Sequence, residues 1–215
     1  MEHKEKQISY TSTNTYLCLN SLGKDTKNVW FVLHGIGFLS KFLIEYFQGL
    51  PKDENYIIAP QAPSKYYLAS KYTHVGAIWL TRENRELEAG NVIRYLDGVH
   101  KEENIPPNCR LIVLGFSQGV SIAARWVAKS RIPCKELILY AGAIPEELTA
   151  EDFDFLTPLN TKIKIVWGTT DEFLDTQRLK KERVKIDNLF HGRTEFIRFE
   201  GGHEINTKVI NELLP

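Results

Sequence analysis

The sequence has few of the features that mark specialised classes of protein. Its 215 residues include only three cysteines, Cys18, Cys109 and Cys134, which are too few and too widely spaced for a disulfide framework or a zinc site. No apolar run approaches the roughly 18 residues that a membrane-spanning helix needs. Lysine plus arginine and aspartate plus glutamate each number 27, so no net charge attracts a nucleic acid or an anionic membrane. The composition therefore argues against membrane-spanning, nucleic-acid-binding and disulfide-stabilised proteins.

From the two ends of the sequence we expect neither a secretory leader nor a lipid anchor. MEHKEKQ at the start lacks the apolar core of a secretory leader, and NELLP at the end has no lipidation motif. We interpret the three cysteines as buried packing residues in a reducing compartment. The sequence thus predicts a cytoplasmic protein that needs no metal and no cofactor.

The order of apolar runs predicts an α/β fold. With 43% hydrophobic and 25% charged residues, the composition is that of an ordinary globular protein, and the length suits a single domain over residues 1–215. Short apolar runs alternate with segments of helical spacing, which predicts a doubly wound, mostly parallel sheet with helices on both faces and little or no cap. We expect strands at Val29–His34, Tyr56–Pro60, Arg110–Gly115, Glu136–Gly142, Lys162–Gly168 and Thr194–Phe199. We expect helices at Ser40–Leu50, Thr81–Val99, after Ser117, at Asp175–Leu189 and at Ile205–Leu214.

Other segments are less regular. Gln7–Asn20 alternates and is rich in threonine and tyrosine, which predicts edge strands joined near Thr13-Asn14. Ser40 is the expected cap of the helix that follows it. The tyrosine-rich stretch Gln61–His74 is expected to be irregular, and Pro145–Leu156 to form an acidic loop or short helix.

One serine separates two apolar elements in the stretch LIVLGFSQGVSIAARW (Leu111–Trp126). Ser117 follows a buried-strand pattern, precedes a helical one and is flanked by Gly115 and Gly119. A serine on so sharp a turn adopts strained dihedrals, and side chains at the two glycine positions would collide with neighbouring elements. The pattern therefore predicts that Ser117 is a nucleophile. The plainer alternative is a tight turn in which Ser117 only caps the helix.

A nucleophilic serine needs a base, and the base needs an orienting acid. In doubly wound hydrolases they follow the serine in the order acid, histidine, each just past the carboxyl end of a strand. Asp171 follows one expected strand by three residues, and His203 lies in a glycine turn after the next. Glu172 and Asp175 are less favoured candidates for the acid. Taken singly, Asp171 also suits a helix start and His203 a turn, but together with Ser117 they predict a catalytic triad.

Two backbone N–H groups usually hold the oxyanion of an acyl-transfer intermediate, one after the nucleophile and one from an earlier loop. Gln118 supplies the first, and Ile36 in VLHGIG (Val32–Gly37) supplies the second. His34 invites a catalytic interpretation, but it precedes a glycine turn far upstream. We therefore interpret His34 as a structural residue.

Five motifs, HGIG, APQAP, GFSQG, WGTTD and GGHEI, occur in this order within residues 29–205. Together they resemble the phospholipase/carboxylesterase family, which includes acyl-protein thioesterases. The resemblance implies an α/β-hydrolase fold with a nearly lidless site that acts on carboxylic esters or thioesters. It also implies the same site residues, namely the triad Ser117, Asp171 and His203 and the oxyanion donors Ile36 and Gln118. The chain departs from the common pattern of the family at Phe38, Val120 and Trp167.

The substrate pocket is less determined. The segment Pro63–Trp79 is a candidate wall of an acyl pocket, through Tyr66, Tyr67, Tyr72 and Trp79. The alternative, which we favour, is ordinary packing of a loop. The basic run Arg178–Lys185 resembles a patch for anionic lipids, although its charges are typical of the wet face of an amphipathic helix.

These observations predict a serine hydrolase that cleaves carboxylic esters of short to medium acyl chains through an acyl-enzyme on Ser117. An acyl thioesterase or a lysophospholipase of the same family is the alternative. A non-catalytic, ligand-binding member of the fold and a peptidase are further alternatives. The expected partner is a small ester or thioester, without nucleic acid or transmembrane segment, and the sequence leaves a homodimer open.

Overall fold

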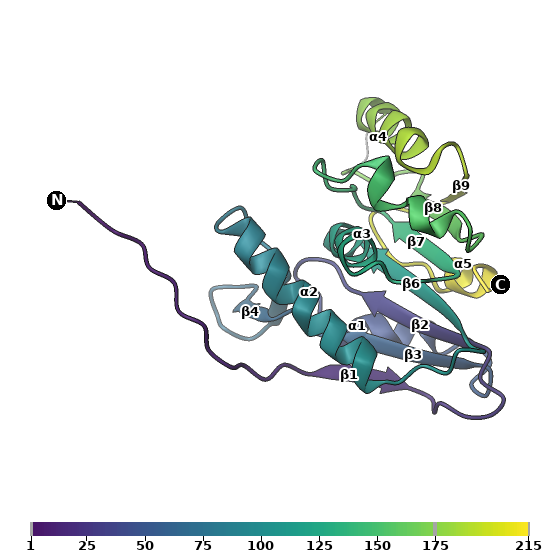
Figure 1. Ribbon diagram of the computed structural model, residues 1–215, viewed down its shortest axis with the longest axis horizontal. Coiled ribbons are helices and arrows are strands. Elements are labelled where there is room, and N and C mark those ends of the chain that lie inside the picture. Colours follow the sequence, from purple (N-terminus) through teal and green to yellow (C-terminus); the bar gives the residue numbers. More distant parts are fainter. Residues whose placement is uncertain (1, 174–175, 215) are drawn as a thin grey trace.

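The main sheet sets the frame of the molecule (Figure 1). The computed structural model describes residues 2–173 and 176–214, and this sheet has seven strands in the order β1-β3-β2-β6-β7-β8-β9. Neighbouring strands run parallel except for the antiparallel pair β1/β3. The strands are β1 (Tyr16–Leu19), β2 (Asn28–Leu33), β3 (Asn55–Pro60), β6 (Arg110–Phe116), β7 (Glu136–Tyr140), β8 (Lys162–Gly168) and β9 (Thr194–Phe199).

Helices cover both faces of this sheet, as Figure 1 shows. One apolar layer packs between the sheet and α2, α3 and α4, and a second packs between the sheet and α1, η1 and α5. Because both faces are covered, β2, β3 and β7 are buried along their full length, which explains their apolar character. The helices are α1 (Ser40–Leu43), α2 (Arg85–Glu102), α3 (Gln118–Ser130), α4 (Thr176–Phe190) and α5 (Thr207–Glu212), with 3₁₀ helices η1 (Ile44–Phe47), η2 (Ala150–Asp152) and η3 (Asp154–Leu156).

The direction of winding reverses between β2 and β6. From β2 the chain adds β3 on one side and later returns to add β6 on the other. In open α/β sheets the crevice beyond the carboxyl ends of the strands at such a reversal is where ligands bind. The loop after β2 and the turn after β6 meet there, because a Cβ built at Gly35 would lie only 3.0 Å from the Cβ of Ser117. The topology therefore places Ser117 in the expected binding crevice.

The predicted alternation of strands and helices is confirmed for the main sheet, but of the edge strands predicted in the N-terminal segment only the second is present. Of Gln7–Asn20, only Tyr16–Leu19 forms a strand. Ile8 and Tyr10 are 91% and 84% exposed, and the chain before β1 runs away from the sheet in Figure 1. Strand preference depends on a half-buried surface against which side chains can pack, and these two side chains lie against none.

Two further local predictions are wrong. Ser40 is the first residue of α1 rather than its cap, and its hydroxyl donates to Gln61 Oε1 at 3.1 Å. The segment Gln61–His74, predicted to be irregular, contains β4 (Ser64–Tyr67), which pairs with β5 (Val75–Ile78) in a separate hairpin. All four residues of β4 are exposed. The strand therefore lacks the alternation of polar and apolar residues by which a half-buried strand is predicted from sequence.

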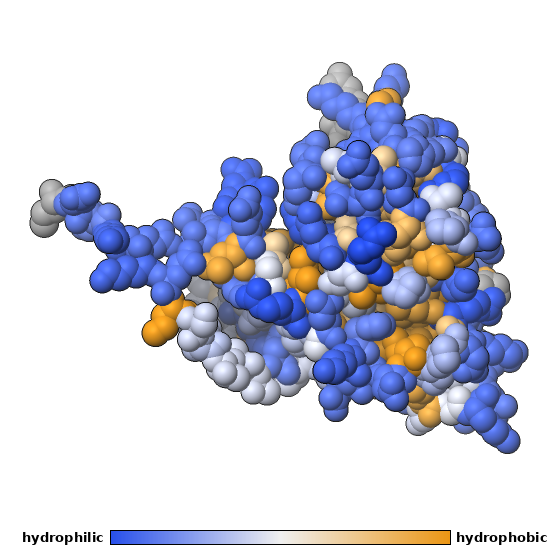
Figure 2. All heavy atoms as spheres, viewed as in Figure 1, coloured by the Kyte–Doolittle hydropathy of each residue, from blue (hydrophilic) through white to orange (hydrophobic). Residues whose placement is uncertain are grey.

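The surface agrees with the balanced composition. Figure 2 shows hydrophilic side chains over most of the visible face, with hydrophobic ones mainly in the gaps between helices. Cys134 is buried and Cys109 is half-buried, but Cys18 is exposed, so the prediction that all three cysteines are packing residues is wrong for Cys18. Among the described residues, no helix is both long enough and apolar enough to cross a membrane.

Candidate active site

Ser117 lies on the sharp turn between β6 and α3. Its backbone has φ 53° and ψ −118°, in a region that residues with side chains rarely occupy. A Cβ at Gly115 would lie 2.3 Å from the carbonyl oxygen of Gly119, and a Cβ at Gly119 would lie 2.1 Å from the carbonyl oxygen of Leu33. Both positions therefore accept only glycine, and the two glycines allow the turn that carries Ser117.

A chain of hydrogen bonds joins Ser117, His203 and Asp171, which lie on three separate loops. His203 Nε2 is 2.8 Å from Ser117 Oγ, and His203 Nδ1 is 2.9 Å from Asp171 Oδ2. Asp171 follows β8, and His203 follows β9, the neighbouring parallel strand. The structure thus brings together the three residues that the sequence predicts as a triad.

The environment of Asp171 suits a carboxylate that orients a histidine. Its side chain has no exposed surface, and Oδ1 accepts a hydrogen bond from the backbone N–H of Phe173 at 2.9 Å. Of the two less favoured acids, Glu172 is exposed, and no hydrogen bond joins it to His203 within the described part of the chain. Asp175 lies outside the described residues.

Two aromatic rings that no sequence pattern marks as functional flank the imidazole of His203. The ring centroids of Phe116 and Phe173 lie 5.3 Å and 4.8 Å from the imidazole centroid. These contacts restrict rotation of the ring, which keeps Nε2 directed at Ser117. Phe116 lies inside GFSQG and Phe173 lies two residues after Asp171, but an aromatic residue next to a motif gives no sign of which side chain it contacts.

The two predicted oxyanion donors lie on the segments that meet at the turn. Gln118 is the first residue of α3, where backbone N–H groups have no acceptor inside the helix. Ile36 follows Gly35, whose backbone lies against Ser117. Within residues 2–173 and 176–214, neither the N–H of Ile36 nor that of Gln118 donates to a protein acceptor. Both groups are therefore available to a bound oxygen atom.

A strut of hydrogen bonds connects these two segments. Gln118 Oε1 accepts from the backbone N–H of Trp79 at 2.9 Å, and Gln118 Nε2 donates to the carbonyl oxygen of Leu80 at 2.7 Å. The indole N–H of Trp79 in turn donates to the carbonyl oxygen of His34 at 2.8 Å, two residues before Ile36. The Gln118–Trp79–His34 strut therefore fixes the positions of the two donors relative to each other.

His34 is held as a neutral side chain inside this region. It has no exposed surface, its Nδ1 lies 2.8 Å from the carbonyl oxygen of Gly35, and its Nε2 accepts from the backbone N–H of Ala62 at 3.0 Å. The first contact requires a proton on Nδ1 and the second requires a lone pair on Nε2. Burial lowers the pKa of His34 from 6.5 to about 4, so the imidazole is uncharged at neutral pH and joins two loops.

The four aromatic residues predicted to wall a pocket fall into two groups. Trp79 is fully buried and packs on His34, with ring centroids 5.0 Å apart. Its side chain has no surface to offer a substrate, which corrects its assignment to the pocket wall. Tyr66, Tyr67 and Tyr72 are 39%, 55% and 71% exposed, so these rings on and beside the β4–β5 hairpin are accessible.

The described residues contain no group of three or more His, Cys, Asp or Glu side chains placed to hold a metal ion.

The sequence model of a family described as "Serine hydrolase (FSH1)" matches residues 53–209, a range that includes Ser117, Asp171 and His203. A comparison with curated proteins finds no match.

Solved structures share the fold. Acyl-protein thioesterase 2 of Zea mays is 16% identical, with a TM-score of 0.64, over 94% of this chain and 96% of that one. A phospholipase/carboxylesterase of Dyadobacter fermentans is 19% identical, with a TM-score of 0.66, over 95% and 98% of the two chains. A Bacillus cereus carboxylesterase is 17% identical, with a TM-score of 0.65, over 94% and 92%. The predicted α/β-hydrolase fold is confirmed, and with it the resemblance that the five motifs carry.

Proposed function

Because the chain belongs to the serine hydrolase (FSH1) family, we propose that it cleaves carboxylic esters of short to medium acyl chains through an acyl-enzyme on Ser117. The observation that carries this proposal is the hydrogen-bond chain from Asp171 through His203 to Ser117. A serine that only capped a helix would bond to the backbone of its own helix, and Ser117 makes no side-chain cap bond.

The geometry supports a mechanism in two halves. His203 Nε2 takes the proton of Ser117 Oγ as the oxygen attacks the ester carbonyl, and the N–H groups of Ile36 and Gln118 hold the negative charge that forms on the carbonyl oxygen. The imidazolium then gives its proton to the departing alcohol, which leaves the acyl group on Ser117. Water attacks the acyl-enzyme in the same way, and release of the acid restores the serine. Asp171 stays ionised throughout and stabilises the imidazolium.

The surroundings of the site favour an open crevice with apolar sides. Ile36 and Phe173 are 53% and 55% exposed, so each side of the crevice offers an apolar surface. The backbone N–H of Gly37 donates to the carbonyl oxygen of Ala77 at 2.8 Å, which anchors the β4–β5 hairpin beside Ile36. Between β7 and β8 the chain forms only η2 and η3, so this connection adds no cap.

Thioesters are the second substrate class. The solved structures of the same fold include an acyl-protein thioesterase and carboxylesterases. The same residues would serve both substrate classes, because the two reactions differ only in the leaving group, which is an alcohol for an ester and a thiol for a thioester. We also propose a cytoplasmic location, which the three unpaired cysteines support.

Labelling with a fluorophosphonate probe tests the role of Ser117. We expect the wild-type chain to be labelled, Ser117→Ala to be unlabelled, and Ser70→Ala, which alters an exposed serine in the hairpin, to be labelled like the wild type. Labelling that persists in Ser117→Ala would overturn the assignment. Rates on p-nitrophenyl esters and acyl thioesters of increasing length then identify the preferred leaving group and chain length.

A further inference from the structure

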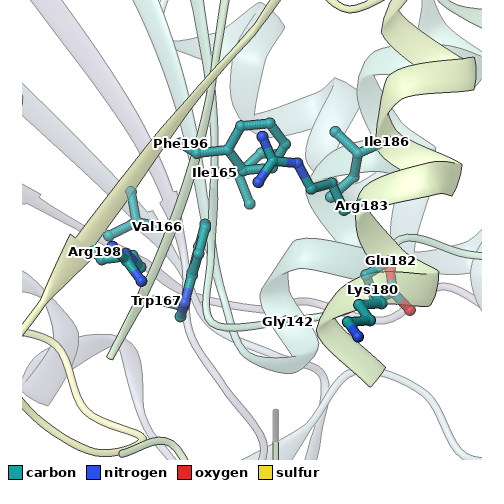
Figure 3. Close-up of a pocket in the computed structure, with 10 residues that line it drawn as sticks. All are labelled: Gly142, Ile165, Val166, Trp167, Lys180, Glu182, Arg183, Ile186, Phe196 and Arg198. Atoms are coloured by element: carbon teal, nitrogen blue, oxygen red, sulfur yellow. The ribbon is translucent and has the colours of Figure 1, made fainter. Parts of the chain in front are cut away.

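A second cavity, separate from the crevice at Ser117, lies between the sheet and α4. Figure 3 shows it between strands β8 and β9 on one side and α4 on the other. Its volume is about 230 Å³, which suits a small ligand. The lining comprises Gly142, Ile165, Val166, Trp167, Lys180, Glu182, Arg183, Ile186, Phe196 and Arg198. None of the candidate triad residues lines it.

The body of this cavity is apolar because of strand register. Ile165 and Trp167 alternate along β8, so both side chains face α4. Their partners across the parallel ladder are Phe196 and Arg198 of β9, which point to the same face. The rings of Trp167 and Phe196 meet edge to face, with centroids 5.8 Å apart, and Ile186 closes the apolar body from α4.

The polar part of the cavity lining is mainly cationic. Lys180 and Arg183 are one turn apart on α4, and Arg198 extends from β9 beside Trp167 (Figure 3). The guanidinium of Arg183 lies over the ring of Phe196, 4.5 Å from its centroid. With Glu182 as the acidic member, the lining carries three cations against one carboxylate.

These three cations have no acidic partners within the described residues. Two other basic residues of α4 differ: Lys185 pairs with Glu146 at 2.9 Å, and Lys181 borders another hollow, towards η2. In the described part of the run, Lys185 therefore pairs with an acid, whereas Lys180 and Arg183 line an apolar cavity together with Arg198 of β9.

We propose that this cavity binds a small amphipathic carboxylate, with its apolar body against Trp167, Phe196 and Ile186 and its anionic head between Arg183 and Arg198. Guanidinium groups suit this role because they bind a carboxylate through two parallel N–H donors. The site does not depend on the reaction at Ser117, although Gly142 at its edge lies against the Ser117 turn, since a Cβ there would be 2.3 Å from the Ser117 carbonyl oxygen.

Tryptophan fluorescence gives a direct test with octanoate as the probe. Trp30, Trp79 and Trp126 are fully buried, whereas Trp167 is half-buried and lines the cavity. We expect octanoate to change the emission in a saturable way with a Kd on the order of 1 mM, and we expect octylammonium and octan-1-ol to bind much more weakly. The response should disappear in Trp167→Phe.

Charge variants identify the cations responsible. Arg183→Gln and Arg198→Gln should each weaken octanoate binding about three- to tenfold, the range expected for accessible charge-assisted contacts. Lys181→Gln is the matched control, because it removes the same charge from α4 outside this cavity, and should change the Kd less than twofold. Pretreatment of Ser117 with the fluorophosphonate should leave binding intact.

Four results would overturn the proposal. They are the absence of a saturable response at about ten times the expected Kd, equal binding of octylammonium, equal weakening by Lys181→Gln, and loss of binding when Ser117 is blocked. The last result would place the probe in the crevice at Ser117. Because Arg183 also packs on Phe196, Arg198→Gln decides the outcome if Arg183→Gln alters the fold.

Discussion

The two sides of the candidate active site are held by different kinds of contact. On the side of β2, the Gln118–Trp79–His34 strut and the neutral imidazole of His34 fix the backbone through buried hydrogen bonds. On the side of β8 and β9, Asp171 contributes a buried charge, and two aromatic rings flank His203.

The difference follows from what each side has to position. An oxyanion is held best by donors that are already in place before charge develops, and neutral buried hydrogen bonds hold a backbone without introducing a competing charge. The other side positions a side chain that gains and loses a proton, so it needs a nearby anion and walls that limit rotation. Substitutions on the charged side should therefore affect the rate, and those on the neutral side should also affect folding stability.

The largest expected effect is on the charged side. Asp171→Asn should lower kcat about 10⁴-fold, because the amide no longer stabilises the imidazolium and favours the wrong tautomer of His203. Ester hydrolysis measures this loss, and thermal unfolding should show a folded protein. The matched control is Glu172→Gln, which alters the adjacent, exposed carboxylate and should stay within about twofold of the wild type. A comparable loss in both variants would contradict the assignment of the acid.

The neutral side should show a pH-dependent stability. The folded chain holds His34 neutral with a pKa of about 4, below its usual 6.5, so at intermediate pH the unfolded chain binds a proton that the folded chain does not. This difference in pKa contributes about 3 kcal/mol to the free energy of unfolding. The contribution is complete above pH 6.5 and is lost as the pH falls towards 4.

Denaturant unfolding at pH 7 and pH 4 measures this contribution. In His34→Asn the decrease between the two pH values should be smaller than in the wild type by about 3 kcal/mol. His74→Asn, at an exposed position, serves as the control and should keep the wild-type decrease. An unchanged decrease in His34→Asn would show that His34 is not held neutral.

The smallest of these effects concerns the strut. Gln118→Leu keeps the size of the side chain but removes both of its hydrogen bonds to Trp79 and Leu80. We expect kcat to fall about tenfold with little change in KM, because the two N–H donors would no longer be held together. Gln118→Glu keeps an acceptor for the Trp79 N–H but places a carboxylate oxygen against the carbonyl oxygen of Leu80 and a negative charge beside the developing oxyanion, so its kcat should fall below that of Gln118→Leu. A rise in KM alone would instead indicate a role in substrate binding.

The sequence predicts the central sheet because burial on both faces leaves continuous apolar runs such as RLIVLG in β6. It does not predict β4, whose residues are all exposed, or the absence of strand before Tyr16. Ser40 is a reasonable cap by residue type, but Gln61, 21 residues away in the chain, supplies the acceptor for its hydroxyl. A local sequence pattern cannot show that a distant residue competes for the hydroxyl of a serine.

The candidate site likewise has parts that the sequence predicts and parts that it does not. The triad can be predicted because each of its members, Ser117, Asp171 and His203, follows an expected strand and lies in a turn that its sequence makes recognisable. The strut could not be predicted, since Gln118 and Trp79 are 39 residues apart and no motif joins them. The cavity at α4 depends on the register of β9 against β8 and on the rotation of α4 about its own axis. The charge pattern of the run Arg178–Lys185 predicts neither of them.

The left-handed backbone of Ser117 restricts which residue can replace it. With φ at 53°, a second heavy atom on Cβ would crowd the backbone, so threonine is disfavoured even though its hydroxyl has the same chemistry. Cysteine has the same branching as serine and meets no such barrier. Exchange of oxygen for sulfur at this position therefore requires no change of main-chain conformation, whereas the addition of one methyl group does.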